Sequence, residues 1–336
     1  MTIQLKDIAK YLNVSVSSVS KTINGTGRVG KETRERIMKA IEELGYQPNE
    51  VARSLKRKSA NSLGVIVSDL SNPFYSKVIK GIESVASRND HHVIVCNSNE
   101  DAHKEEEYVK LLMQNRVSGL IIASVGGNPK ALKPYIRSGI PFVFIDNEPR
   151  IDEQYNLVTI DNIKASYELT QHLLDQGHRH LAIITGPLDQ STALERKLGF
   201  EKCLSDNGVT MSEQWVGSGE FKQASGYAIM KDWLKRDQLP TALFAANDFL
   251  LYGATKALYE RGLRIPDDMA VACFDADDET GLIRPRLTSV VQPAYDIGAA
   301  AAEMIMRRKQ EGAPRQAERI VLESSFRPNE SSLKGR

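Results

Sequence analysis

The 336-residue sequence predicts an α/β protein in which a three-helix N-terminal headpiece precedes two doubly wound α/β subdomains. Three observations support this fold class. Apolar residues recur at helical spacing through the first 45 residues, and Lys and Arg are concentrated in the first 60. From Ser62 onward, short runs rich in Val and Ile alternate with amphipathic helical stretches, which is the pattern of βα units. A chain of this length is expected to contain two or three domains.

Residues 5–24 have the pattern of a helix-turn-helix. Ile8, Ala9 and Leu12 mark one face of a first short helix, and Ser15 is a suitable N-cap for a second. In the second helix Val19 and Ile23 share the face that is predicted to be buried. The opposite face suits close approach to base edges in the major groove, because it carries small residues and one cation: Val16, Ser17, Ser18 and Lys21. The alternative is a two-helix corner of an ordinary α-helical domain.

A third helix is predicted over residues 31–44, with Gly45 at the position typical of a C-terminal cap. The headpiece is small for an independent core, so we expect its stability to be marginal. Residues 1–60 contain twelve Lys and Arg against six Asp and Glu, although the whole chain has a net charge of only +1. A basic head on an acidic body is typical of a module that binds a polyanion, although a solvated surface of modest charge would look similar.

The stretch 51–58 is a short basic segment with a leucine among its cations. It is too short to be stable as an isolated helix in water. Leu55 lies among Arg53, Lys56 and Arg57, which suits a wedge between base steps of the minor groove with phosphate contacts on either side. A flexible basic linker is the alternative, and a segment that folds only on DNA would satisfy both interpretations.

Residues after Ser62 are predicted to form parallel sheets covered on both faces, because the connections are short and the Val and Ile runs are continuous. The number of βα units fits two similar subdomains. The expected strands lie at 63–67, 92–96, 119–123, 142–145, 181–185, 242–245, 270–274 and 320–322, and the expected helices include 129–138 and 296–308. The predicted boundaries are 1–47 for the headpiece, 48–60 for the hinge and 61–330 for the core, with subdomains at 61–160 plus 291–322 and at 161–290.

Enzyme activity has no positive support in the sequence. It contains no Walker lysine loop, no G-x-G-x-x-G fingerprint, no nucleophile elbow and no Cys or His pair with metal-ligand spacing. We therefore expect no catalytic residues, no cofactor and no metal. Cys96, Cys203 and Cys273 lie far apart near apolar segments, which is typical of buried thiols in a reducing compartment. No apolar run approaches the roughly 20 residues of a membrane span, and the N-terminus lacks the apolar core of a signal peptide, so a cytoplasmic protein is expected.

Polar and aromatic residues follow the predicted strands at their carboxyl ends, where doubly wound sheets bind ligands. Carboxylates, amides, aromatic faces and one arginine suit a polyhydroxylated ligand, since a ring stacks on an apolar face and each hydroxyl needs donors and acceptors. For a single Asp or Asn, capping of the following helix is an equally good explanation. The candidate positions are Asn72, Phe74, Tyr75, Asp146, Thr192, Arg196, Phe221, Asn247 and Asp275.

With these features the chain resembles the lactose/galactose repressor (LacI/GalR) family over essentially its whole length. The matching segments include 5–9, 46–49, 51–56, 117–121, 246–248 and 287–289. The resemblance implies a hinge helix at 48–60 and a core of periplasmic-binding-protein type, whose two subdomains are joined by three crossovers. It places base-reading residues at Val16, Ser17 and Lys21 and a minor-groove wedge at Leu55, and it adds Gln292 to the ligand positions. The expected DNA contacts also include Ser18, Asn49, Arg53 and Lys56.

The expected function is a transcription factor, a repressor of carbohydrate catabolic genes, that binds a pseudo-palindromic operator as a dimer. A small effector between the subdomains would change their angle and so favour or disfavour the paired hinge helices. The effector is expected to be a sugar, and Arg196 leaves a sugar acid or a sugar phosphate open. The chain ends shortly after Pro328 without a heptad tail, which favours a dimer. A sugar-sensing module without DNA activity and an enzyme acting on sugars are the alternatives.

Overall fold

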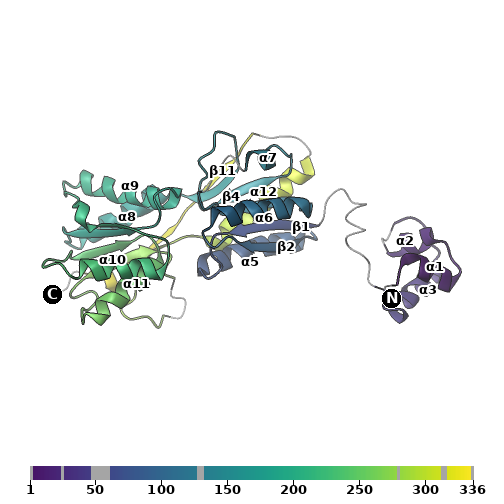
Figure 1. Ribbon diagram of the computed structural model, residues 1–336, viewed down its shortest axis with the longest axis horizontal. Coiled ribbons are helices and arrows are strands. Elements are labelled where there is room, and N and C mark those ends of the chain that lie inside the picture. The colour runs from purple at the N-terminus through teal and green to yellow at the C-terminus, as the bar shows by residue number, and fades with distance from the viewer. Residues whose placement is uncertain are drawn as a thin grey trace. The chain divides into compact units, whose positions relative to one another are not determined.

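The computed structural model describes residues 3–23, 26–46, 61–126, 132–277, 281–311 and 316–333. The chain divides into two compact units, residues 1–60 and 61–336 (Figure 1). The predicted hinge, with Asn49, Arg53, Leu55 and Lys56, lies outside the described residues.

The first unit contains the three predicted helices α1 (Leu5–Leu12), α2 (Val16–Ile23) and α3 (Lys31–Glu43). Ser15 caps α2, because its Oγ accepts the backbone N–H of Ser18 at 3.0 Å, as predicted. The three helices enclose a small core of fully buried side chains, formed mainly by Ile8, Val19 and Ile37. Gly45 follows α3 in the left-handed conformation, with a φ of 62°, which confirms the predicted C-terminal cap.

The first lobe of the second unit is a parallel sheet with helices on both faces. Its six strands have the order β11-β5-β4-β3-β1-β2. They are β1 (Ser62–Val67), β2 (His92–Asn97), β3 (Gly119–Ile122), β4 (Phe142–Ile145), β5 (Leu157–Ile160) and β11 (Arg319–Leu322). One face packs against α5 (Pro73–Arg88) and α12 (Ala294–Glu311), and the other against α6 (Ala102–Gln114) and α7 (Lys133–Ile136). This lobe therefore has the doubly wound architecture that the sequence predicts.

The second lobe repeats this topology. Its sheet has the order β12-β10-β9-β8-β6-β7, which matches the first lobe strand for strand, and β12 is its antiparallel edge. The strands are β6 (Leu181–Thr185), β7 (Val216–Ser218), β8 (Ala242–Ala245), β9 (Ala270–Phe274), β10 (Thr288–Val291) and β12 (Ser325–Arg327). The helices are α8 (Asn162–Asp175), α9 (Ser191–Asp206), α10 (Gln223–Trp233) and α11 (Asp248–Glu260), with 3-10 turns at Glu213–Trp215 and Glu330–Ser332.

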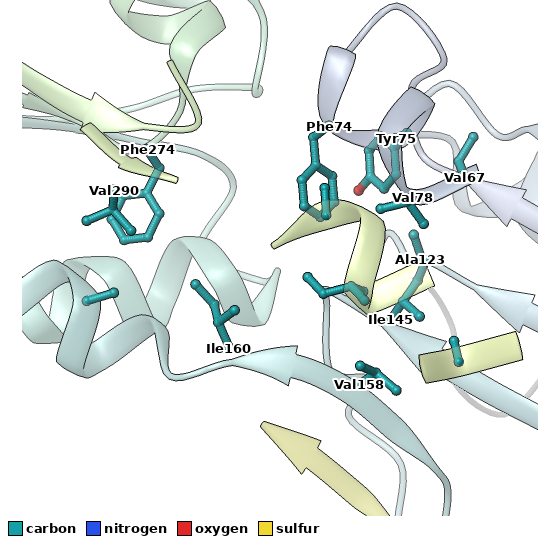
Figure 2. Close-up of a cluster of buried hydrophobic side chains, with 14 of the residues drawn as sticks. Val67, Phe74, Tyr75, Val78, Ala123, Ile145, Val158, Ile160, Phe274 and Val290 are labelled. Atoms are coloured by element: carbon teal, nitrogen blue, oxygen red, sulfur yellow. The ribbon is translucent and has the colours of Figure 1, made fainter. Parts of the chain in front are cut away.

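The chain passes between the lobes three times, from β5 to α8, from β10 to α12 and from β11 to β12. One cluster of buried apolar side chains includes residues of both lobes. Figure 2 shows Phe74 and Tyr75 near Val78 in the first lobe, and Phe274 beside Val290 in the second. The strand ends of the two sheets are thus joined through packed side chains, and the crossovers are the places at which the lobes can change their angle.

Several elements differ from the sequence-based expectation. The strands β5, β7 and β12 were not predicted. The strands β7 and β12 have only three residues each, with too few apolar side chains to show a period, and β5 is a short run of four residues, Leu157–Ile160. The helix expected at 129–138 appears as the short α7, and residues 127–131 lie outside the described part. The last long helix extends beyond the predicted 296–308 at both ends.

Glycines allow the paired helices to approach closely. A Cβ atom added to Gly298 of α12 would lie 2.0 Å from the carbonyl oxygen of Val78 in α5, and one added to Gly81 would lie 2.0 Å from that of Tyr295. Backbone atoms cannot move aside as the end of a flexible side chain can. These two glycines therefore fix the spacing between α5 and α12 on the inner face of the first lobe.

Gly298→Ala is expected to lower the free energy of unfolding by about 2–3 kcal/mol, because the two helices must separate to admit the methyl group. Urea denaturation followed by circular dichroism measures this loss. Glu83→Ala, an exposed position on α5, is the matched control and should change stability by no more than about 0.5 kcal/mol. Equal stabilities for the two variants would contradict the close packing of α5 on α12.

Candidate functional site

A pocket lies between the two lobes, at the carboxyl ends of the strands in both sheets. All ten ligand positions expected from the sequence line it: Asn72, Phe74, Tyr75, Asp146, Thr192, Arg196, Phe221, Asn247, Asp275 and Gln292. The enclosed space is about 30 Å³, far below the roughly 300 Å³ at which pockets for small molecules begin. A sugar-sized ligand therefore requires a movement of the lobes or of the lining side chains.

Two aspartates occupy equivalent positions in the two lobes. Asp146 directly follows β4 and Asp275 directly follows β9. Both have left-handed backbones, with φ values of 62° and 64°, a conformation that Asp tolerates better than most residues do. The N–H of Asp146 donates to the carbonyl of Val158 at 3.1 Å, and that of Asp275 to the carbonyl of Val290 at 2.8 Å. The repeated topology thus brings one carboxylate from each sheet to the pocket.

Hydrogen bonds fix both carboxylates in place. Tyr75 donates its hydroxyl to Oδ2 of Asp146 at 3.0 Å and accepts a hydrogen bond from Ser68 at 2.9 Å. Gln292, at the β10–α12 crossover, donates its Nε2 to Oδ2 of Asp275 at 2.8 Å. Burial raises the pKa of Asp146 to about 6 and also raises that of Asp275, since burial disfavours the charged form.

Arg196 is the buried cation of the pocket and comes from α9. It is 3% exposed. Its Nε donates to Asn162 Oδ1 at 2.9 Å and its Nη1 to the carbonyl of Ala246 at 2.6 Å. The guanidinium carbon lies 4.1 Å from the centroid of the Phe274 ring, a cation–π contact. Arg196 therefore has a structural role at the strand ends of the second lobe as well as a place in the pocket.

The aromatic and amide residues have mixed roles. Asn72 and Asn247 cap α5 and α11, because their Oδ1 atoms accept the backbone N–H of Phe74 and of Leu250, each at 2.9 Å. The two asparagines thus cap the helices, as the alternative explanation proposed, and they also line the pocket. The ring of Phe221 packs against Gly186, whose added Cβ would lie 2.4 Å from the ring.

The pocket contains five residues that the sequence reasoning did not select: Ser68, Asp69, Glu100, Asn147 and Gln190. Gln190 donates to Glu100 at 2.7 Å and accepts from Asn147 at 3.2 Å, so it bonds across the cleft to two loops of the first lobe. Thr192 adds a bond from its Oγ1 to Asn147 at 2.8 Å. Asp69 and Glu100 follow the ends of β1 and β2, so the strand-end rule applied to every strand would have found them.

A second, larger cavity of about 440 Å³ shares Phe74, Asp275 and Gln292 with the pocket. It also contacts Lys77 of α5 and Asp248 of α11. Burial raises the pKa of Asp248 to about 7. The shared residues separate the two cavities and come from both lobes, Phe74 from the first and Asp275 from the second. A change of the angle between the lobes would therefore alter both volumes.

The predicted DNA-reading face of the headpiece is solvent-accessible. Val16, Ser17 and Lys21 are exposed on α2, and Val16 retains 48% of its accessible surface. Ser18 is half-buried, and its hydroxyl is 2.9 Å from that of Ser15. Three of the four predicted residues, Val16, Ser17 and Lys21, are thus accessible on α2. The fourth, Ser18, takes part in the N-terminal cap with Ser15.

Metal binding and membrane insertion have no support in the described part of the chain. Its His, Cys, Asp and Glu residues form no group of three or more that could hold a metal ion. None of its helices is long and apolar enough to cross a membrane. Cys96, Cys203 and Cys273 are free and buried.

Two family models together match most of the chain. Residues 4–49 match the bacterial regulatory proteins of the lacI family. Residues 60–320 match the periplasmic binding proteins and sugar binding domain of the LacI family. The boundary between the two matches falls near the boundary between the two compact units at residues 60 and 61.

Full-length relatives and solved structures agree with these models. Catabolite control protein A of Priestia megaterium is 32% identical over 308 residues, 91% of this chain and 92% of that protein. The transcriptional repressor PurR of Haemophilus influenzae (strain PittEE) is 34% identical over 305 residues, 90% of each protein. The lac repressor dimer bound to operator and the anti-inducer ONPF superposes with a TM-score of 0.85 at 27% identity, covering 99% of this chain and all of that one.

A complex of the transcriptional regulator CelR with cellobiose is also similar, with a TM-score of 0.73 and 30% identity over 98% of this chain and 99% of that one. These relatives are transcriptional regulators and not enzymes, in agreement with a sequence that has no catalytic motif. The chain belongs to the LacI family of bacterial DNA-binding regulatory proteins, and it is a transcriptional repressor with a ligand-binding core.

Proposed function

We propose that the chain works in the cytoplasm as a homodimer, in which residues 1–47 and the hinge at 48–60 bind a pseudo-palindromic operator. The core at 61–330 binds a small, sugar-like effector between its subdomains, 61–160 plus 291–322 and 161–290. Val16, Ser17, Ser18 and Lys21 contact bases or phosphates in the major groove, and Asn49, Arg53, Leu55 and Lys56 act at the minor groove. The genes under control serve carbohydrate catabolism.

The observation that carries this proposal is the pocket between the lobes, in which ten residues distant in sequence converge. Its space of about 30 Å³ cannot hold a sugar without rearrangement. An effector that enters must therefore move the lobes or the lining side chains, and a movement of the lobes would change bonds across the cleft such as that from Gln190 to Glu100. A ligand shifts an equilibrium between two states only if its affinity for them differs, and a pocket too small for the ligand in one of the states supports such a difference.

The composition of the pocket supports a hydroxylated ring as the effector. Phe74 and Phe221 offer aromatic faces for the apolar side of such a ring. Asp146, Asp275 and Asn247 supply acceptors and donors for hydroxyl groups. Similar proteins bind molecules of the same class: CelR is in complex with cellobiose, a LacI family regulator from Enterococcus faecium with ribose, and the lac repressor with ONPG.

Lys21→Ala is expected to weaken operator binding about tenfold and to lower the salt dependence of binding by about one counterion, if the ammonium group contacts a phosphate. The residue is exposed on α2, so its removal should leave the fold intact. Fluorescence anisotropy with a labelled operator at several salt concentrations measures both quantities. Lys39→Ala, an exposed position on α3, is the control. An unchanged affinity and salt slope in Lys21→Ala would remove Lys21 from the interface.

The proposed function is tested by one titration with the full chain. Sugars that raise the melting temperature identify candidate effectors, because a ligand of the folded state stabilises it by mass action. Operator affinity is then measured with and without each of them. A salt-dependent affinity that changes at least tenfold with one sugar supports the proposal. Operator binding that no stabilising ligand changes would favour a regulator that is not switched through this pocket.

A further inference from the structure

The pocket between the lobes contains more negative charge than positive charge. Four carboxylates line it, and the cation among its lining residues is Arg196: the carboxylates are Asp69, Glu100, Asp146 and Asp275. Asp248, 3% exposed, lies near the same arginine on the side of the larger cavity. A single guanidinium is thus shared among several carboxylates.

Arg196 cannot neutralise this group. Two of its nitrogens are already occupied by Asn162 and by the carbonyl of Ala246. Its charge lowers the pKa of Asp146 and of Asp275, yet burial outweighs that effect and both values remain above the ordinary range. Glu100 has a raised pKa for the same reason, and its charge adds to the repulsion at Asp146. Glu100 and Asp146 are therefore two carboxyl groups, one half-buried and one buried, that repel each other within one pocket.

The hydrogen-bonding groups show a matching excess of acceptors. Oε1 of Gln292 is a buried acceptor without a hydrogen-bond partner among the described residues, and the side chain is 6% exposed. Two donors of the pocket are used internally, because Gln190 donates to Glu100 and Tyr75 donates to Asp146. A buried acceptor left without a donor is costly, so the pocket favours a ligand that brings N–H and O–H groups.

Lys222 lies outside the lining of the pocket and lowers the pKa of Glu100, but it does not cancel the charge there. Its Nζ is 2.8 Å from Glu220, and the two side chains are 38% and 63% exposed. The influence of Lys222 on Glu100 is smaller than that of burial, and the pKa of Glu100 stays raised. Lys222 is thus shared between Glu220 and the Glu100 end, so that end of the pocket favours an additional cation.

We propose that the effector of this protein is a hydroxylated amine, such as an amino sugar, whose ammonium group is bound between Glu100 and Asp146. Its hydroxyl groups then face Asp275, Gln292 and Arg196 at the other end of the pocket. An ammonium group brings three donors and one positive charge to the place where both are lacking. A sugar acid or a sugar phosphate would add an anion among four carboxylates, which disfavours both. This inference rests on the proposed function, because it concerns the effector of the same pocket.

The test is isothermal titration calorimetry of the full chain with matched compounds: glucosamine, galactosamine and mannosamine, their parent hexoses, the corresponding uronic acids and the hexose 6-phosphates. The inference predicts that one amino sugar binds at least tenfold more tightly than its parent hexose, and that the matching acid and phosphate bind more weakly than both. A uronic acid or a phosphate as the tightest ligand would overturn it, as would a neutral hexose that binds as tightly as its amino form.

Glu100→Gln separates charge from shape. The glutamine keeps an acceptor for Gln190 and nearly the same volume, so an unchanged melting temperature is expected and verifies the fold. Affinity for the amino sugar should fall at least tenfold, while affinity for the parent hexose should change by less than about threefold. Glu220→Gln, which alters an exposed carboxylate outside the pocket, should change neither. Equal losses for the amino sugar and the hexose would contradict an ammonium site at Glu100. If no compound in the set binds, the proposed sugar-like effector is itself contradicted, and the inference falls with it.

Discussion

Asp275→Asn is expected to abolish the response to the effector and to leave operator affinity without effector within about twofold of that of the parent protein. The carboxylate lies in the pocket, where it accepts hydrogen bonds from the backbone and the side chain of Gln292. Hydrogen bonds to charged groups contribute about 1.5–3 kcal/mol each. Loss of the charge should therefore lower the affinity for the effector about 10- to 100-fold. Asparagine has a similar volume and tolerates the left-handed backbone, so the fold is kept.

Operator affinity at increasing effector concentration measures this variant directly. Asp267→Asn, an exposed aspartate of the same lobe, is the matched control and should respond like the parent protein. A normal response in Asp275→Asn would show that Asp275 does not contact the effector. Loss of operator binding without effector would show instead that the variant has altered the headpiece or the dimer, and the melting temperature distinguishes these cases.

Arg196→Met is expected to lower the free energy of unfolding by about 3 kcal/mol and to remove the effector response as well. Methionine can fill the space next to Phe274, but it leaves the carbonyl of Ala246 and the carboxylates of the pocket without their cation. Removal of one partner from a buried charged network typically costs about 3–5 kcal/mol. Urea denaturation measures the loss, with Arg261→Met at an exposed position as control.

The cost of Arg196→Met should be larger at pH 8 than at pH 5. Asp146 and Asp248 have pKa values raised to about 6 and about 7 in the folded protein. A carboxyl group with a raised folded pKa binds its proton more tightly in the folded state, so its contribution to stability falls as the pH rises through that range. Without Arg196 the pKa values of Asp146 and Asp248 rise further, because the arginine lowers both. At pH 8 the two carboxylates are then charged without a neighbouring cation, which increases the cost of the substitution. A cost that does not change between the two pH values would contradict this electrostatic role.

Much of the pocket could be predicted because of one regularity of α/β folds. Asp146, Asn247 and Asp275 directly follow buried strands, and the carboxyl ends of parallel strands meet at one edge of each sheet. Runs of Val and Ile predict where most of the strands lie. Only the family resemblance predicts that the two sheets face each other across a cleft. Glu100 follows the end of β2 and could have been found by the same regularity, whereas the bond of Gln190 across the cleft to Glu100 has no sequence signature.

Other features required the structure because they depend on contacts distant in sequence. The backbone carbonyl of Ala246, which holds Arg196, has no sequence signature. The three-residue strands β7 and β12 form only because they pair with β6 and β10. The excess of carboxylates in the pocket depends on Asp69 and Glu100, which lie in loops after β1 and β2 and line the same pocket as Asp146. The sequence predicts a sugar as the effector, and this excess is the basis of our proposal that the sugar carries an amine.

The measurement that tests the account most directly is the affinity of the effector for the full chain, both free and saturated with operator DNA. Binding at two sites that are coupled must be reciprocal, so the factor by which the effector changes operator affinity must equal the factor by which the operator changes effector affinity. We predict equal factors of about tenfold or more, both of which disappear in Asp275→Asn. An effector that fills the pocket with the same affinity in the free and the operator-bound protein would contradict the coupling between the cleft and the headpiece.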